Sequence, residues 1–310
     1  MRILIELPTW LGDAVMTSPA INNLISHFEG VELTIIGSQV SLEVIENHPR
    51  IVNSRLLNKN LLSQFFLARE IGEFDYFFSF RNSTRSKILK FFIRSKNKFH
   101  FESSKYHDTH QVEKYNSFID ASLGVKTEPG KLKIYLDNSY HKKQSPLLLL
   151  GINPGASYGQ AKRWYPEKFA EVSLELSSKY DIIILGGDKE VEIAHDIERL
   201  LIKNKVLNFK NLAGKTSVSD LKNIISSFDL FITGDSGPMH IAASFNVPTV
   251  SIFGPTNSTE TSQWMNDNGI VVMKNLSCQP CLKRTCPLKH HKCMKEITGN
   301  EVFEAVKLVT

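Results

Sequence analysis

The chain has 310 residues, of which 42% are hydrophobic and 22% are charged, and its formal net charge is +5. This length and composition are those of a globular protein with room for two hydrophobic cores, so we expect two domains. No apolar run approaches the roughly 18 residues needed to cross a bilayer, and the N-terminus lacks the regions of a signal peptide. These features argue against a membrane-spanning or secreted protein and predict a cytoplasmic location.

Short apolar runs alternate with longer amphipathic stretches in the first half of the chain. The runs at 2–7, 31–36 and 75–80 are expected to be strands, and the stretch 14–28 is expected to be a helix that begins near Ala14. Such alternation is typical of βαβ units, in which helices cover a parallel sheet. The sequence therefore predicts an α/β fold, with a first Rossmann-like domain over residues 1–145.

The same pattern restarts after a polar stretch, which predicts a hinge at 138–146 and a second α/β domain over 146–310. Its expected strands are 147–152, 181–185, 229–233 and 249–253, and its expected helices are about 166–178, 189–203 and 218–227. A last amphipathic helix is expected at about 300–309. The sequence leaves open whether this helix packs back on the first domain.

Polar loops follow several of the predicted strands, and open α/β sheets bind their ligands at such strand ends. The first loop contains Gly12 and Asp13. Glycine allows a tight turn, and the helix dipole favours the charged form of an acid near a helix N-terminus. Asp13 is interpreted as the cap of the following helix or as a general base at the cleft between the domains, and the two roles are compatible.

Two loops of the second half carry features of a phosphate site. The segment 151–172 contains the turn NPGA at 153–156 and then the adjacent cations Lys162 and Arg163, which would suit a phosphate, although surface loops also carry such pairs. The turn Gly254-Pro255-Thr256 ends the strand at 249–253. It is interpreted as an ordinary β-to-α turn or as part of the same diphosphate site.

The segment GDSGP at 234–238 looks like the nucleophile loop of trypsin-like serine proteases. It lacks the second glycine of that motif and lies between a parallel-type strand and a helix, so a protease is disfavoured. Asp235 or Ser236 is expected to be the N-cap of a helix with Pro238 in its first turn. The donors then available to an anion are the backbone N–H groups of Ser236, Gly237 and Met239 and the imidazole of His240.

Most of the excess positive charge lies in the first half, where residues 76–101 contain no acid and seven cations: Arg81, Arg85, Lys87, Lys90, Arg94, Lys96 and Lys98. One interpretation is a solvated helix face with Phe91, Phe92 and Ile93 in the core. The other is a site for a polyanion. No nucleic-acid-binding motif is present, and an anionic lipid or a phosphorylated sugar fits equally well.

All four cysteines lie in one short stretch, at Cys278, Cys281, Cys286 and Cys293, with His290 and His291 between the last two. In a reducing cytoplasm, thiolates at this spacing can bind a structural zinc ion that organises a polar loop. The alternatives are reduced thiols in a tight loop and disulfides formed after purification.

Together these motifs resemble glycosyltransferase family 9, the ADP-heptose:lipopolysaccharide heptosyltransferases. The resemblance spans almost the whole chain and rests on WLGD at 10–13, NPGA at 153–156, AKRWYP at 161–166, GDSGPMHIAA at 234–243 and FGPT at 253–256. PTWLGD and AKRW are closer to the heptosyltransferase II type than to type I. The family implies a GT-B architecture, in which two Rossmann-like domains face each other across a cleft and the C-terminal one holds most of the nucleotide sugar.

The resemblance also implies roles for individual residues. Asp13 would be the catalytic base in a single inverting displacement, and Lys162 would neutralise the leaving ADP, so that no metal ion is essential. The implied donor-binding residues are Asn153, Gly155, Lys162, Arg163, Gly186, Asp235, Ser236, Gly237, His240, Gly254 and Thr256. The implied acceptor-binding residues are Trp10, Gly12, Arg81, Lys87, Lys90 and Arg94.

The implied partners are ADP-heptose and a membrane-anchored lipopolysaccharide inner-core acceptor, with peripheral contact with the inner membrane and no nucleic acid. The expected reaction adds L-glycero-D-manno-heptose to an inner-core heptose. Heptosyltransferase I activity on Kdo-lipid A stays open. A GT-B nucleotide-sugar epimerase also stays open but is disfavoured, because Asp13 lies where an acceptor base is needed and the basic acceptor face would have no purpose. A scaffolding module is disfavoured because Asp13, Lys162 and the turn GDSG at 234–237 are all intact.

Overall fold

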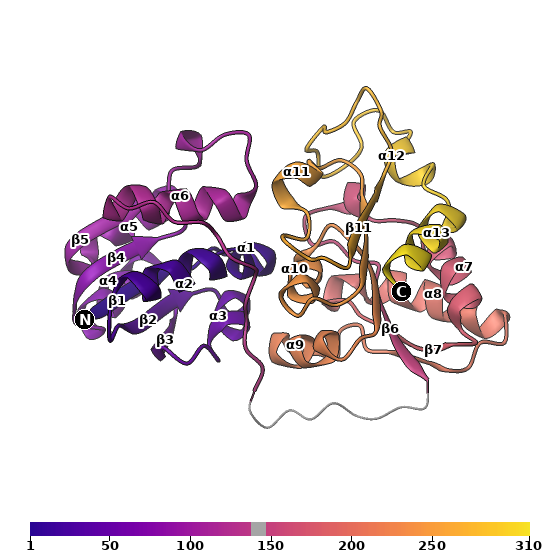
Figure 1. Cartoon of the computed structure of the whole chain (residues 1–310), viewed down its shortest axis with the longest axis horizontal. Coiled ribbons are helices and arrows are strands. Elements are labelled where there is room, and N and C mark those ends of the chain that lie inside the picture. Colours follow the sequence, from indigo (N-terminus) through magenta and orange to yellow (C-terminus); the bar gives the residue numbers. More distant parts are fainter. Residues whose placement is uncertain (138–146) are drawn as a thin grey trace. The chain divides into compact units, whose positions relative to one another are not determined.

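The structure, a computed structural model, describes residues 1–137 and 147–310. The chain divides into two compact units, Met1–Asp137 and Asn138–Thr310, and each unit is built on one sheet (Figure 1). The predicted hinge at 138–146 and the predicted boundary within it lie outside the described residues. Within the described ranges, no helix combines the length and the apolar character that crossing a bilayer requires.

The first unit is a five-stranded parallel sheet in the order β3-β2-β1-β4-β5. Its strands are β1 (Arg2–Glu6), β2 (Glu32–Gly37), β3 (Ile51–Leu56), β4 (Glu73–Ser79) and β5 (Arg94–His100). Its helices are α1 (Leu11–Met16), α2 (Ser18–His27), α3 (Gln39–Ile45), α4 (Leu61–Glu70), α5 (Thr84–Phe92), the 3-10 turn η1 (Ser103–Lys105) and α6 (Gln111–Leu123).

The strand order of this sheet explains which strands the sequence revealed. β1 lies at the centre between β2 and β4, and Ile3, Leu4 and Ile5 are fully buried. Strands covered on both faces are apolar at successive positions, which is why they were predicted. The order reverses between β1 and β4, so ligands are expected at the carboxyl ends of these two strands.

The predicted helix at 14–28 is two helices, α1 and α2, separated at Thr17. The Thr17 hydroxyl donates to the Ala14 carbonyl at 2.7 Å, and Pro19 in the first turn of α2 has no N–H to continue a helix from α1. The N-cap of α1 is Trp10, so α1 begins before Ala14 and Asp13 lies in its first turn. The prediction of Asp13 as the cap is therefore wrong.

The cationic stretch at 76–101 is not one helix face, because it forms the end of β4, all of α5 and all of β5. Ile93 is buried as predicted, whereas Phe92 is half-buried and Phe91 is 82% exposed. The expectation that Phe91 belongs to the core is wrong. β5 is the edge strand of the sheet, and charged side chains on an edge strand oppose pairing with another chain.

The second unit is a six-stranded parallel sheet in the order β11-β10-β9-β6-β7-β8. Its strands are β6 (Leu148–Asn153), β7 (Tyr180–Ile184), β8 (Phe209–Asn211), β9 (Leu230–Gly234), β10 (Thr249–Phe253) and β11 (Gly269–Met273). Its helices are η2 (Gln160–Lys162), α7 (Pro166–Leu176), η3 (Asp188–Glu190), α8 (Val191–Lys203), α9 (Val218–Ser226), α10 (Gly237–Ser244), α11 (Ser258–Thr261), α12 (Lys292–Lys295) and α13 (Gly299–Val309).

The core of this unit joins its sheet to the C-terminal helix. α13 packs against α7, β10 and β11, so the predicted last helix packs on its own unit. Trp164 is 1% exposed and donates its indole N–H to the Ile297 carbonyl at 3.1 Å, which ties the start of α7 to the segment before α13. The predicted α/β fold class, with two Rossmann-like units, is confirmed.

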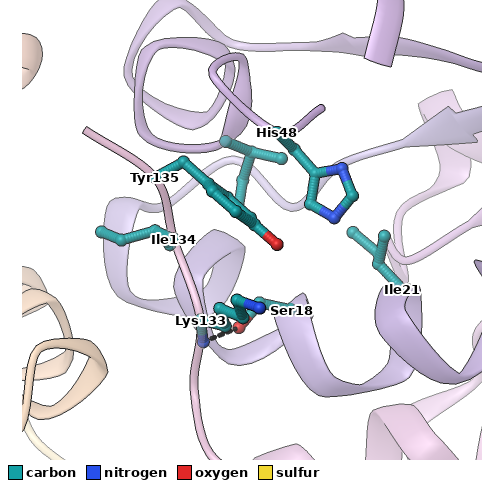
Figure 2. A pocket seen from close by; sticks show the side chains of 7 residues that line it. Ser18, Ile21, His48, Lys133, Ile134 and Tyr135 are labelled. Atoms are coloured by element: carbon teal, nitrogen blue, oxygen red, sulfur yellow. Dashed lines mark hydrogen bonds between the residues drawn. The ribbon is translucent and has the colours of Figure 1, made fainter. Parts of the chain in front are cut away.

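A small cavity in the first unit lies between α2 and the segment that leads towards the second unit (Figure 2). The Lys133 N–H donates to the Ser18 hydroxyl at 3.0 Å, and the His48 ring meets the Tyr135 ring edge-on at 4.8 Å. His48 Nδ1 accepts the N–H of Arg50 at 3.1 Å, which requires a ring unprotonated at that nitrogen. Burial, reinforced by the charges of Lys133 and Arg50, lowers the pKa of His48.

The lowered pKa of His48 predicts that the protein loses stability in mild acid. Because the folded-state pKa of His48 lies below the ordinary value near 6.5, the unfolded chain binds a proton first as the pH falls. The neutral His48 side chain makes its full contribution to the free energy of unfolding above about pH 6.5. This contribution is lost as the pH falls through and below that value. His48→Gln should reduce the pH dependence of unfolding by at most about one proton between pH 7 and pH 5. Denaturant titrations at several pH values measure this, and an unchanged pH dependence would contradict it.

Candidate functional site

The carboxyl ends of β6, β9 and β10 bring together most of the residues that the sequence singled out in the second half. The strand order of the second sheet reverses between β6 and β9, which is where ligands of such sheets bind. Asn153 ends β6, and its side-chain amide donates to the hydroxyls of Thr233 at 3.2 Å and Ser236 at 3.1 Å. This amide therefore joins the ends of the two central strands.

Asp235 is the centre of this group. Its Oδ2 lies 2.5 Å from the Lys162 ammonium and also accepts the Thr256 hydroxyl at 2.5 Å. The Lys162 and Asp235 side chains are 12% and 5% exposed. A buried carboxylate needs such partners, because an unpaired charge in the interior is strongly unfavourable. Three loops, those after β6, β9 and β10, thus meet at one carboxylate oxygen.

The helix α10 begins at this point, with Ser236 as its N-cap. The N-cap position agrees with the prediction, but the Ser236 side chain does not cap the helix and pairs instead with Asn153 and Thr233. The N–H of Met239 donates to the Ser236 carbonyl at 3.1 Å, so the expectation that it faces an anion is wrong. Ser236 and Gly237 remain the candidate backbone donors of this turn, and His240 is buried on the same helix.

A buried acid that the sequence analysis missed, Glu190, organises a second part of the site. Its Oε2 accepts the Gly187 N–H at 2.7 Å, and a Cβ on Gly155 would lie 2.3 Å from its Cγ. Arg163 approaches its Oε1 at 3.6 Å, and in the described structure neither that oxygen nor Arg163 Nε has a hydrogen-bond partner. A Cβ on Gly186 would lie 3.0 Å from Glu190 Cβ. The sequence could have identified Glu190 as a site residue, because it follows β7 in the chain as the other site residues follow their strands.

Gly254 has a packing role at the end of β10. A Cβ at this position would lie 2.5 Å from the sulfur of Met294 and 3.3 Å from that of Cys293. The absence of a side chain lets the turn that carries Thr256 pack directly on α12. Gly254 therefore supports the site through close approach of the backbone.

Residues 274–291 form an irregular segment, which we call the clasp, and it holds two of the site loops. The Gln279 side chain donates to the Gly254 carbonyl at 2.6 Å, and the Leu282 N–H donates to the Pro255 carbonyl at 2.8 Å. On its other side, the Arg284 carbonyl accepts the Ala161 N–H at 3.0 Å. The clasp thus fixes the loop before Thr256 and the loop before Lys162.

Tyr158 connects the clasp to the Lys162 ammonium. Its hydroxyl donates to the Leu282 carbonyl at 2.7 Å. Its ring lies 4.9 Å from Lys162 Nζ and 5.3 Å from the Arg284 guanidinium, both within cation–π range. His291 adds a further link, because its Nε2 lies 2.9 Å from the Ala161 carbonyl.

All four cysteines, three of which belong to the clasp, line one small cavity, and all are free thiols. Burial, with the neighbouring cysteines adding to it, raises the pKa of Cys293 to about 11, so this thiol is protonated at neutral pH. In the described ranges, no group of three or more histidine, cysteine, aspartate or glutamate side chains is placed to hold a metal ion. The zinc hypothesis for Cys278, Cys281, Cys286 and Cys293 therefore gains no support from their arrangement.

In the first unit, a buried acid that the sequence analysis also missed lies at the reversal point of the sheet. Glu6 ends β1, is fully buried, and accepts the Ser79 hydroxyl at 2.6 Å from the end of β4. The Arg81 guanidinium lies 3.3 Å from the same carboxylate. Burial raises the pKa of Glu6, and the Ser79 hydroxyl and the Arg81 charge oppose this rise. Arg81 is thereby held beside the carboxyl end of β1.

Asp13 lies beside α6 on the helix that follows β1. It is half-buried, and its charge adds to the effect of burial in raising the pKa of Tyr115 well above the ordinary value. Tyr115 on α6 therefore stays protonated near Asp13. Of the neighbouring acceptor candidates, Gly12 is buried, whereas Trp10 is 52% exposed although its ring is large and apolar.

The cations predicted to bind an acceptor lie at opposite ends of the strands of the first sheet. His100 ends β5, and the charges of Lys87 and Lys90, after burial, lower its pKa, so both lysines lie near the carboxyl end of that strand. Arg94 begins the same strand at the opposite end and pairs with Glu73 at 3.4 Å. The structure therefore groups Lys87 and Lys90 with the carboxyl end of β5 and separates Arg94 from it.

Each unit thus offers a different chemistry at its strand ends. The second unit has a cation, a buried acid, two hydroxyls and a helix N-terminus, which is a set suited to a phosphorylated ligand. The first unit has a carboxylate on α1 and fixed cations, which suit proton transfer and the binding of an anionic molecule.

The model of glycosyltransferase family 9 (heptosyltransferase) matches residues 78–292, more than half of the chain. The chain belongs to this family. It is a glycosyltransferase, as predicted. It is also 43% identical to the lipooligosaccharide heptosyltransferase 2 of Campylobacter jejuni serotype O:2, over 99% of this chain and 98% of that protein. The family assignment from the motifs is therefore confirmed.

Solved structures support the fold. ADP-heptose lps heptosyltransferase II of Escherichia coli superposes with a TM-score of 0.84 at 19% identity, covering 100% of this chain and 98% of that one. The E. coli heptosyltransferase WaaC, solved with ADP, superposes with a TM-score of 0.78 at 15% identity and covers 100% of both chains. At these identities the likeness concerns the fold of the family members.

The shared carboxylate predicts a coupling between Lys162 and Asp235. Lys162→Met leaves a buried carboxylate without its cation, so the free energy of unfolding should fall by about 3 kcal/mol. Lys162→Met combined with Asp235→Asn should recover most of this loss, because the remaining amide carries no charge. The exposed Lys189→Met is the matched control and should leave stability unchanged. Additive effects of the two substitutions in denaturant unfolding would contradict the coupling.

Proposed function

We propose that this glycosyltransferase moves L-glycero-D-manno-heptose from ADP-heptose to the heptose of a lipooligosaccharide or lipopolysaccharide inner core, the reaction of the heptosyltransferase II type. The observation that supports this most directly is similarity over the full chain to a lipooligosaccharide heptosyltransferase 2, combined with the group around Asp235 at the reversal point of the second sheet.

The second unit is proposed to bind the donor. Lys162, the Thr256 hydroxyl and the N–H groups of Ser236 and Gly237 would contact the diphosphate, with His240 as a further donor. Arg163 Nε and Glu190 Oε1 are buried without a hydrogen-bond partner in the described structure, which supports a ligand at this place, because such atoms are rare in native proteins. A hydroxyl of the nucleotide or of the sugar could satisfy the glutamate oxygen.

Lys162 is proposed to shift between two partners during the reaction. Its ammonium pairs with Asp235, which keeps it in place at the site. As the bond between the anomeric carbon and the diphosphate breaks, negative charge grows on the departing ADP, and a pre-positioned ammonium stabilises that charge. The positive charge supplied by the chain is the reason that no metal ion enters the proposal, and zinc at the cysteines has no role in it.

Asp13 is proposed to be the general base. Its carboxylate would take the proton from the acceptor hydroxyl as the hydroxyl oxygen attacks the anomeric carbon of the heptose. The new glycosidic bond forms on the face opposite the departing ADP, and the bonding electrons leave with the ADP, so configuration is inverted. The nearby Tyr115 keeps its proton, so it does not compete as a base.

The acceptor is proposed to bind the first unit through its anionic groups. Arg81, fixed by Glu6, and the lysines Lys87 and Lys90 supply positive charge at the carboxyl ends of its strands. Trp10 and Gly12 lie at the start of the helix that carries Asp13. A membrane-anchored acceptor would bring the enzyme to the inner membrane as a peripheral protein.

Replacing the base tests the reaction directly. Asp13→Asn should fold normally and lower the turnover number by about two to four orders of magnitude, the range for a lost general base, with little change in ADP binding. The assay follows ADP release from ADP-heptose in the presence and absence of a heptose-containing core acceptor. Asp196→Asn on α8 is the control and should retain full activity. ADP release that ignores the acceptor would contradict heptosyl transfer, and full activity in Asp13→Asn would exclude this residue as the base.

Because Lys87 and Lys90 lie near one end of β5 and Arg94 lies at the other, we expect only the two lysines among these three cations to contribute to acceptor binding. On a delipidated, water-soluble acceptor, Lys87→Gln and Lys90→Gln together should raise the acceptor KM by about threefold to tenfold and leave the donor KM unchanged. Arg94→Gln should leave both constants unchanged, because this residue lies at the other end of β5. An effect of Arg94 equal to that of the lysines would contradict this expectation.

A further inference from the structure

The outward faces of α4 and α5 in the first unit expose large apolar side chains. Leu62, Phe66 and Phe91 are 69%, 66% and 82% exposed. Isolated exposed apolar residues are common on proteins, whereas a contiguous group of large ones marks an interaction site. The question is therefore whether these side chains lie together.

Ring contacts connect the exposed Phe66 and Phe91 through the half-buried Phe65 and Phe92. Phe66 contacts Phe65 with ring centroids 5.7 Å apart, Phe65 contacts Phe92 at 5.4 Å, and Phe92 contacts Phe91 at 6.1 Å. Leu62 precedes Phe66 by one turn of α4, so the two share a helix face. We call Leu62, Phe65, Phe66, Phe91 and Phe92 the aromatic row, and it crosses from α4 to α5, two helices in direct contact.

Within the aromatic row, Phe92 packs against the hydrophobic core beneath it, whereas the exposed Leu62, Phe66 and Phe91 do not belong to that core. The other core contacts of these helices come from positions such as Ala68 of α4 and Leu89 of α5, which are 1% and 0% exposed. Folding therefore does not require the exposed phenylalanines at positions 66 and 91. Their exposure calls for a partner that removes them from water.

The charges around the row are mainly positive. The Arg69 guanidinium lies over the Phe65 ring at 4.8 Å, and Lys87 precedes Phe91 by one turn on α5. The nearby acids are matched by arginines, since Glu73 pairs with Arg94 at 3.4 Å and Glu70 lies 3.8 Å from Arg55. Exposed aromatic rings surrounded by cations suit a lipid surface with anionic headgroups, because the rings enter the interfacial layer and the cations stay at the headgroups.

We infer that the aromatic row is a membrane-docking surface, which inserts Leu62, Phe66 and Phe91 into the interface of an anionic lipid leaflet. A second copy of the chain fits less well, because a two-fold symmetric contact would place the same cations against each other. The inference goes beyond the proposed reaction, since it rests on contacts within the first unit and needs no substrate.

Vesicle sedimentation of the full chain, without donor or acceptor, tests the inference. The protein should sediment with phosphatidylglycerol-rich vesicles and stay in the supernatant with pure phosphatidylcholine. Phe66→Ser with Phe91→Ser should weaken binding to the anionic vesicles about tenfold or more. Leu207→Ser with Leu308→Ser is the matched control, because these leucines are 80% and 78% exposed in the second unit, and it should bind like the wild type.

Three results would overturn the inference. The first is wild-type protein that does not sediment with anionic vesicles, and the second is a double phenylalanine variant that binds as the wild type does. The third is a dimer in light scattering that the phenylalanine substitutions dissociate, which would assign the surface to self-association. Turnover on a soluble acceptor should be unchanged in the phenylalanine variant, so a failure of docking and a failure of the proposed reaction are distinguishable.

Discussion

One carboxylate oxygen holds the second unit's site together. Asp235 Oδ2 receives the Lys162 ammonium and the Thr256 hydroxyl, so three loops from three different strands have to meet within hydrogen-bond distance of one buried atom. A charge in such a position is tolerated only when it is paired, which makes the geometry of the loops mutually dependent. The placement of the ammonium, and hence the proposed handling of the leaving group, follows from this pairing.

The first unit also has a buried polar side chain at the end of its central strand. Glu6 closes its central strand as Asn153 closes the central strand of the second unit, and both side chains reach across to the neighbouring strand where the sheet order reverses. In each case a buried polar group at the strand end holds a cation or hydroxyls in place. The two halves of the chain therefore place charged groups at the reversal point with different residues: one half fixes Arg81 and the other fixes Lys162.

The sequence predicted those features that depend on local pattern. Strands such as β1 and β10 are buried on both faces, so their apolar runs and the polar turns after them were visible. The edge strand β5 escaped prediction because it is polar, with lysines at two of its positions. Partners distant in the chain were also hidden, and for that reason Glu6 and Glu190 were not identified, although each ends or follows a strand. The N–H of Met239 was misjudged because its local bond to Ser236 depends on the geometry of the turn.

The clasp has a consequence for how enzymes of this kind can be rebuilt. Because residues 274–291 bind the backbones of the turn after β10 and of the loop before Lys162 at the same time, these three stretches form one inseparable module, although more than a hundred residues separate the first from the last. If only the two loops were grafted from a relative into this chain, they would pack against a clasp with a different sequence from the one that holds them in that relative. Exchange of donor specificity by recombination should therefore require crossover points that transfer the cysteine-rich stretch together with the loops it holds.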